Sequence, residues 1–274
     1  MLPLTISLLQ LDQVWENKSL NQTRISELTQ GLTTDLLLIP EMMDTGFSMN
    51  TQLAEPWDSS NGSLAFILAL AQRIGGAVYT SLMVKTSTGC VNRGVWATPD
   101  GEASFYDKRK TFKLAGEDRH FLSGESEAVV SYKGWKINLQ VCFDLRFPEL
   151  VRNALIQGKP RYDLLLYVAN WPEKRILHWD ALLRARAIEN QCVVAAVNRV
   201  GVDGNQLHYS GNSSVIGMDG SEWLSTPKHQ EGLFSTVLNP EEVINYRQKL
   251  PFLEENLDES TNTLKLGVNK KLNS

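Results

Sequence analysis

Cys142 stands where a thiol could act as a nucleophile. It follows the apolar run Lys136–Val141, which predicts a buried strand, and it precedes Pro148-Glu149, whose order suits the first turn of a helix. A side chain at such a corner is exposed at the carboxyl end of a sheet, with nearby backbone N–H groups pointing at whatever it attacks. A lone cysteine is more often a small buried hydrophobe. The charged stretch Asp144–Arg146 that follows argues against a plain core position.

Two ionisable residues, Glu41 and Lys108, also fall at predicted strand ends. Glu41 ends the apolar strand Asp35–Pro40, and Lys108 follows a predicted hairpin strand. Because ligand sites in α/β sheets cluster at the carboxyl ends of strands, both are expected to converge with Cys142. A thiol, a carboxylate and an ammonium together make an acyl-transfer site. From spacing alone, Glu41 could instead be a solvated charge, and Lys108 could belong to a basic turn over Asp107–Lys110.

The elements that must position these residues are predicted from apolar runs and the turn residues between them. In the first half they are strand Thr5–Leu9, helix Asn17–Gly31, strand Asp35–Pro40, helix Ser63–Gly75, strand Ala77–Val84, and a hairpin of Val91–Thr98 and Glu102–Tyr106 turned at Asp100-Gly101. In the second half they are strand Lys136–Val141, helix Pro148–Gly158, strand Asp163–Ala169, helix Leu177–Asn190, strand Cys192–Val197, and a hairpin turned at Asp219-Gly220.

Each half therefore reads β-α-β-α-β-β. Fully apolar strands that alternate with helices imply sheets covered on their outer faces. Two such halves packed sheet to sheet give an α/β fold, a four-layer α-β-β-α sandwich. The repeated Asp-Leu-Leu-Leu could be chance, but the parallel placement of the two Asp-Gly turns argues for a real repeat.

The joining segment Leu114–Glu127 is polar but is no low-complexity linker. We therefore expect residues 1–274 to form a single domain. The tail at about 251–274 is acidic at first and then basic and Asn-rich, and we expect it to lie over the surface or on a partner subunit.

Composition excludes several classes of function. The net charge of −4 leaves no basic footprint for nucleic acid, and no apolar run is long enough to span a bilayer. The N-terminal residues lack the basic region of a signal peptide, and three widely spaced cysteines do not make a disulfide framework. We therefore expect a cytoplasmic protein. Four scattered histidines, without a CxxC or HExxH pattern, indicate neither a metal site nor a cofactor.

Three blocks of sequence together carry a resemblance to a known family. They are Leu38–Glu41 with Gly46-Phe47, Tyr106–Lys108, and Val141–Glu149, and in order and spacing they resemble the nitrilase superfamily of carbon-nitrogen hydrolases. The resemblance extends from Leu4 to about Leu250. It is strongest to the bacterial omega-amidase (2-oxoglutaramate amidase) branch, in the segments Tyr106–Arg109, Tyr167–Pro172, Ala185–Asn190 and Asn198–Gly201.

The resemblance implies a Glu-Lys-Cys triad at Glu41, Lys108 and Cys142, with a second glutamate, Glu117, in the segment between the halves. In this chemistry Glu41 takes the thiol proton, and Lys108 with the backbone N–H of Phe143 stabilises the oxyanion. Ammonia leaves, and a thioester remains on Cys142 until Glu41 activates water. One departure is visible. The run Arg109–Phe112 replaces the His-Leu-Phe usual in relatives, which leaves the local substrate contacts open.

Omega-amidases cleave small dicarboxylate monoamides such as 2-oxoglutaramate and 2-oxosuccinamate, so a cation is needed for the distal carboxylate. The planar fork of Arg146 suits bidentate binding, although an ion pair with Asp144 or Glu149 is an equal alternative. The next cations to consider are Arg109, Lys113 and Arg175. Apolar walls are expected from Phe47, Met43 and Trp171, with a core position as the alternative for Met43.

Other functions stay open at this point. Within the family, the alternative is an amidase of deaminated glutathione or of another carbamoyl or nitrile compound. Outside it, a catalytically silent binding protein on the same fold is disfavoured by the intact triad. A redox-sensing thiol protein would need a resolving cysteine beside Cys142, and none is near in sequence. The only partners expected are a small amide substrate and a second copy of the chain, paired through Pro148–Gly158 and Leu177–Asn190.

Overall fold

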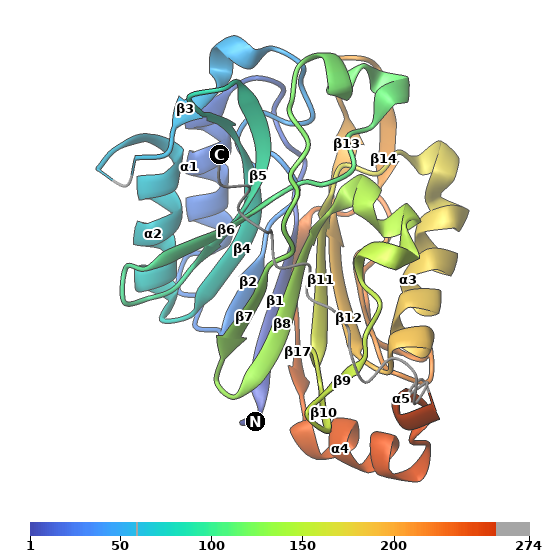
Figure 1. The fold of residues 1–274 in the computed structure, drawn as a ribbon. Coiled ribbons are helices and arrows are strands. Elements are labelled where there is room, and N and C mark those ends of the chain that lie inside the picture. The colour runs from blue at the N-terminus through green and yellow to red at the C-terminus, as the bar shows by residue number, and fades with distance from the viewer. Residues whose placement is uncertain (59, 256–274) are drawn as a thin grey trace, which may run out of the picture.

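Two β-sheets packed face to face form the centre of the molecule, and helices cover their outer faces (Figure 1). The structure is a computed structural model that describes residues 1–58 and 60–255. The predicted surface or partner contact of the tail at about 251–274 falls largely outside the described residues. No helix in the described part of the chain has the length and apolar character needed to cross a bilayer.

The first sheet has the strand order β17-β1-β2-β4-β5-β6, with β3 beside β4. Strands β1, β2 and β4 are parallel, whereas β5 and β6 add an antiparallel hairpin. The strands are β1 (Leu4–Gln10), β2 (Leu36–Leu38), β3 (Glu55–Pro56), β4 (Ala77–Lys85), β5 (Cys90–Ala97), β6 (Ala103–Asp107) and β17 (Gly232–Leu238).

The second sheet has the order β16-β15-β12-β11-β8-β7, with β8, β11 and β12 parallel at its centre. The strands are β7 (Val129–Tyr132), β8 (Trp135–Val141), β11 (Leu164–Ala169), β12 (Val193–Asn198), β15 (Ser214–Ile216) and β16 (Glu222–Ser225). A separate two-stranded ribbon joins β13 (Val200–Val202) to β14 (His208–Ser210) near the carboxyl ends of these strands.

Helices α1 (Lys18–Leu28) and α2 (Gly62–Ile74) cover the first sheet, and α3 (Ile176–Asn190) covers the second (Figure 1). Helices α4 (Pro240–Lys249) and α5 (Phe252–Glu255) follow the last strand. The continuous apolar run in β2 is explained by this layering. Leu36 and Leu38 face the core between the sheets, whereas Leu37 packs under the helices. The predicted four-layer α-β-β-α sandwich is confirmed.

The helix predicted over Pro148–Gly158 is wrong. The segment holds a single 3-10 turn, Pro148–Leu150, and then a small hairpin of β9 (Leu155–Ile156) and β10 (Lys159–Pro160). Gln157 and Gly158 both have positive φ, which is the geometry of a tight hairpin turn. The buried amide of Asn153 also binds the backbone carbonyls of Tyr162 and Asn190, so it holds the chain in a non-helical path.

Strand β17 was not predicted, and it changes the repeat. It comes from the second half of the chain but pairs antiparallel with β1, from Leu4 opposite Leu238 to Gln10 opposite Gly232. The first sheet is therefore completed by the end of the second half.

Candidate active site

The predicted catalytic side chains converge at the carboxyl ends of the two sheets. Glu41 lies shortly after β2, Lys108 directly after β6, and Cys142 directly after β8. The Lys108 ammonium is 2.9 Å from Oε1 of Glu41 and 2.8 Å from Oε1 of Glu117. Glu41 and Glu117 are fully buried and Lys108 is 1% exposed. The structure thus brings together all four residues, Glu117 included.

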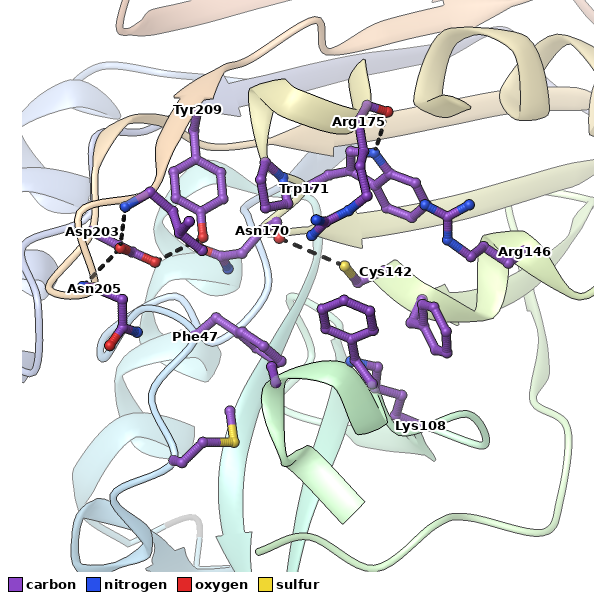
Figure 2. Close-up of a pocket in the computed structure, with 16 residues that line it drawn as sticks. Phe47, Lys108, Cys142, Arg146, Asn170, Trp171, Arg175, Asp203, Asn205 and Tyr209 are labelled. Carbon is purple, nitrogen blue, oxygen red and sulfur yellow. Dashed lines mark hydrogen bonds between the residues drawn. The ribbon is translucent and has the colours of Figure 1, made fainter. Parts of the chain in front are cut away.

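Cys142 begins a short 3-10 segment, Cys142–Arg146, at the sharp corner after β8. Its φ of 45° lies in the left-handed region, which a residue other than glycine rarely adopts. Such strain persists only where the surroundings fix it, and it clusters at functional sites. The thiol lies 3.9 Å from the backbone oxygen of Asn170 and lines a pocket (Figure 2).

The electrostatics of the site keep the thiol protonated at rest. Burial raises the pKa of Cys142 well above its ordinary value, and the nearby charge of Glu41 raises it further, against the opposing effect of Lys108. A thiol in this setting becomes a nucleophile only when a base takes its proton. Glu41 is the carboxylate positioned to do so.

Lys108 stays an ammonium for the opposite reason. Burial alone would lower its pKa, but the charges of Glu117 and Glu41 outweigh that effect and raise the pKa above its usual range. A buried cation beside the thiol can stabilise an oxyanion without first having to be reorganised.

Two asparagines complete the site, and sequence reasoning missed both. The side-chain amide of Asn92, in β5, donates to Oε1 of Glu41 at 2.7 Å and to Oε1 of Glu117 at 3.2 Å. The backbone N–H of Asn170 donates to Oε2 of Glu41 at 3.0 Å, and its side chain donates to the Glu41 carbonyl at 2.5 Å. The available signals were a polar residue inside the apolar strand β5, and a polar residue directly after β11.

The pocket in front of Cys142 encloses about 90 Å³. Phe47 and Trp171 form part of its wall, as expected, and the ring of Phe47 lies 5.1 Å from the Lys108 ammonium. Met43 does not: it is fully buried in the core beneath α1 and α2, so its expected place in the wall is corrected. The β13–β14 ribbon closes another side with Asp203, Asn205, Leu207 and Tyr209.

Two guanidinium groups line this pocket, those of Arg146 and Arg175. Arg146 stacks over Trp171 at 4.6 Å and lies 3.2 Å from Nδ1 of His178, and Arg175 stacks over Phe112 at 5.2 Å. Within the described residues neither has a carboxylate partner. The alternative of an Arg146 ion pair with Asp144 or Glu149 is therefore wrong.

The other two cations considered for the substrate carboxylate, Arg109 and Lys113, do not line the pocket. Arg109 donates to the Leu150 carbonyl, and Lys113 lies beside a neighbouring surface groove. The ring of Phe143 packs against Phe112 at 4.9 Å, which fixes the segment that carries its backbone N–H. The oxyanion role of that N–H remains a prediction.

Comparison with known proteins finds similar sequences over most of the chain. The family model described as carbon-nitrogen hydrolase matches residues 5–248. Omega-amidase YafV of Escherichia coli is 39% identical over 249 residues, which is 90% of this chain and 94% of that protein. The 2-oxoglutaramate amidase of Bacillus subtilis is 28% identical over 257 residues, which is 92% of this chain and 96% of that protein.

A solved structure agrees closely with the fold. A CN-hydrolase superfamily protein from Xanthomonas campestris, which carries an arsenic adduct in its active site, superposes with a TM-score of 0.90. It is 41% identical to this chain, and the match covers 93% of this chain and 97% of that one.

Proposed function

The chain belongs to the carbon-nitrogen hydrolase family, and on that premise we propose that it is an omega-amidase acting on small dicarboxylate monoamides. Membership of the family makes it a hydrolase of amide carbon–nitrogen bonds. The proposed substrates are 2-oxoglutaramate and 2-oxosuccinamate, and the products are the dicarboxylate and ammonia. The similarity to omega-amidase YafV and to a 2-oxoglutaramate amidase supports this choice of substrates.

In the proposed acylation, Glu41 takes the proton of the Cys142 thiol, and the sulfur attacks the amide carbonyl carbon. The carbonyl oxygen becomes an oxyanion beside the Lys108 ammonium and the backbone N–H of Phe143. Glu41 then returns the proton to the amide nitrogen. The carbon–nitrogen bond breaks, ammonia leaves, and a thioester remains on Cys142.

In the proposed deacylation, a water molecule takes the place that ammonia has left. Glu41 removes a proton from it, the resulting hydroxide attacks the thioester carbon, and the acid is released as the thiol regains its proton. Glu117 holds Lys108 and Asn92 holds Glu41 during both steps, since Glu117 accepts from the Lys108 ammonium and the Asn92 amide donates to Glu41. Asn92 also donates to Glu117, which links the two supports.

The observation that carries the choice of substrate is the pair of arginines at the pocket. Arg146 and Arg175 are close enough that Arg175 lowers the pKa of Arg146, in addition to the larger effect of burial. Two cations without a carboxylate partner in the described residues favour an anionic group on the part of the substrate that points away from Cys142.

The first test is release of ammonia from a panel of compounds at equal concentration. The panel holds 2-oxoglutaramate, 2-oxosuccinamate, glutamine, deaminated glutathione and a simple nitrile. The proposal expects the two oxo-acid monoamides to give the highest kcat/KM. A clear preference for deaminated glutathione or the nitrile would contradict it. Intact-mass analysis of acid-quenched enzyme should also show an acyl adduct that Cys142→Ala lacks.

The second test is Arg146→Met, assayed with 2-oxoglutaramate and with an uncharged amide of similar length. A bidentate guanidinium–carboxylate pair is worth about 2–3 kcal/mol, so kcat/KM for the charged amide should fall roughly thirty- to hundredfold. The neutral amide should lose little. Arg146→Lys keeps the charge without the fork and should recover part of the loss. An equal loss for both amides would mean that Arg146 supports the Cys142 segment, and Arg175→Met would then be tested.

The proposed setting is a reducing cytoplasm, which keeps a nucleophilic thiol free. The cysteines at 90, 142 and 192 are all free in the structure.

A further inference from the structure

Asp144 is a buried carboxylate that touches the segments on either side of two catalytic residues. Its Oδ1 accepts the backbone N–H of Lys110 at 2.9 Å. Its Oδ2 accepts the hydroxyl of Tyr106 at 2.9 Å and the backbone N–H of Val141 at 3.2 Å. Tyr106 and Lys110 flank Lys108, and Val141 immediately precedes Cys142. One side chain therefore reaches both the lysine segment and the nucleophile segment.

These two segments need a connection because they belong to different sheets. Lys108 follows β6 in the first sheet, and Cys142 follows β8 in the second, so no strand ladder fixes one relative to the other. Cys142 also has the strained φ of 45°, which the chain adopts only if its neighbours hold it. The bond from the Val141 N–H to the Asp144 carboxylate closes the turn that contains Cys142.

The energetics indicate that Asp144 is not there for stability. It is fully buried, and burial raises its pKa to about 6, against the opposing effects of Lys108, Tyr106 and the two backbone donors. A buried carboxylate whose charge is disfavoured costs stability that a neutral isostere would not cost. Stability given up at an active site is a common mark of a functional role.

We propose that Asp144 is a positioning residue, which holds the Cys142 thiol and the Lys108 ammonium in their catalytic arrangement through Val141, Lys110 and Tyr106. It does not line the pocket, so it acts through these neighbours and does not touch the substrate. The inference rests on Cys142 as the nucleophile but not on the identity of the amide.

The test compares Asp144→Asn with a matched control, Asp163→Asn. Asn cannot accept from all three donors, because one of its two terminal groups is itself a donor. Asp163 is also a largely buried aspartate that accepts a backbone N–H, from Lys136 at 3.1 Å, and it pairs with Arg247 at 2.6 Å. It lies before β11, at the end of that strand opposite to Asn170.

For Asp144→Asn we expect kcat to fall between about tenfold and a hundredfold, which is the cost of a small misplacement of reacting groups. KM should change by less than about threefold, since the pocket wall is intact. Alkylation of Cys142 by iodoacetamide, which requires no substrate, should slow by a similar factor at the same pH. The thermal midpoint should not fall. Asp163→Asn should show the reverse, a lower midpoint with normal kcat and normal alkylation.

Wild-type kcat and alkylation in Asp144→Asn would overturn the proposal, and so would an activity loss that only follows the folded fraction. If Asp144→Asn does not fold, Tyr106→Phe decides the question. It removes one of the three donors, and we expect a smaller loss of kcat and of alkylation rate, about threefold to tenfold. Unchanged values there would also overturn the proposal. Because alkylation needs no amide, a wrong substrate assignment would leave this result unaffected.

Discussion

The ammonium of Lys108 neutralises two carboxylates that have no access to solvent, so its removal affects both chemistry and stability. In Lys108→Met, Glu41 and Glu117 would remain buried without a compensating cation. Breaking a buried ion pair in this way costs about 3–5 kcal/mol. We expect turnover to be lost and the free energy of unfolding to fall by that amount, measured by urea denaturation at neutral pH.

The control for this variant is the double change Lys108→Met with Glu117→Gln. It removes one of the two buried negative charges that Lys108 had neutralised, so it should recover part of the stability and none of the turnover. A Lys108→Met protein as stable as the wild type would show that the two carboxylates are compensated by other groups.

Asp144 should also give the stability of the protein a pH dependence with a definite sign. Its pKa is about 6 in the folded protein against an ordinary value of 3.8, so between these values the folded state keeps a proton that the unfolded chain has released. The contribution of this group to stability is therefore greatest in acid. It falls by about 2 kcal/mol as the pH rises from roughly 4 to 7.

The groups that face Asp144 do not change charge in that interval. They are Tyr79, Tyr106, Tyr167 and Lys108, and the pKa of each is raised above its ordinary value. The difference in unfolding free energy between Asp144→Asn and the wild type should thus move in favour of the variant by about 2 kcal/mol from pH 4.5 to pH 7. A difference that stays constant with pH would contradict the assignment.

At the scale of elements, most of the sandwich could be predicted because its central strands are buried on both faces. A strand such as β11 reads as a continuous apolar run, and the turn residues between runs mark its ends. Strand β17 could not be predicted in this way. Its residues before Leu238 are half-buried or exposed, so it has no continuous apolar run. Its partner β1 lies more than two hundred residues away, so no local pattern specifies the pairing.

The same limit applies to the site. The positions of Glu41, Lys108 and Cys142 at strand ends made them candidates, because strand ends meet at one edge, and the resemblance to the nitrilase superfamily then implied the triad. The roles of Asn92 and Asn170 were not, because they depend on which donors the two sheets bring against Glu41. The helix predicted from Pro148 is absent for a local reason. The proline and the acidic residue after it suit a helix start, but the hydrogen bonds of Asn153 and the turn at Gly158 hold the segment in a non-helical path.

The segment that joins the halves, Leu114–Glu127, is also part of the support for Lys108. Its Gly124 donates a backbone hydrogen bond to the Lys108 carbonyl at 2.8 Å. A Cβ added at Gly124 would lie 2.1 Å from the backbone oxygen of Asp107. Gly124→Ala must therefore displace either the segment or the end of β6. We expect lower thermal stability and a loss of kcat between about tenfold and a hundredfold.

Ser123→Ala is the control, since Ser123 is the exposed neighbour of Gly124. It should leave thermal midpoint and kcat unchanged. Normal kinetics in Gly124→Ala would show that the joining segment can shift without moving Lys108.

For the whole molecule, we predict a homodimer in which α3 lies at the interface. Leu177 is 79% exposed and Ile188 is 49% exposed, and their spacing along α3 places both on one face of the helix. An isologous contact through this face would cover both side chains. The region after Pro148, which has no long helix, can contribute only its short turn and hairpin.

Sedimentation at micromolar concentration should show a dimer for the wild type and a shift towards monomer for Leu177→Glu. Thr23→Glu, on the far side of the sandwich in α1, is the matched control and should remain dimeric. An active wild-type monomer under these conditions would refute the prediction.

The pairing of β1 with β17 has a consequence for synthesis on the ribosome. Strand β1 cannot pair with β17 until residues 232–238 have been translated and released. Until then β1 presents a row of unpaired backbone groups beside apolar side chains, which is a template for joining another chain. A nascent chain that stalls before Gly232 is therefore expected to aggregate and not to persist as a folded, inactive fragment. A chain that is completed can pair β17 with β1 and fold.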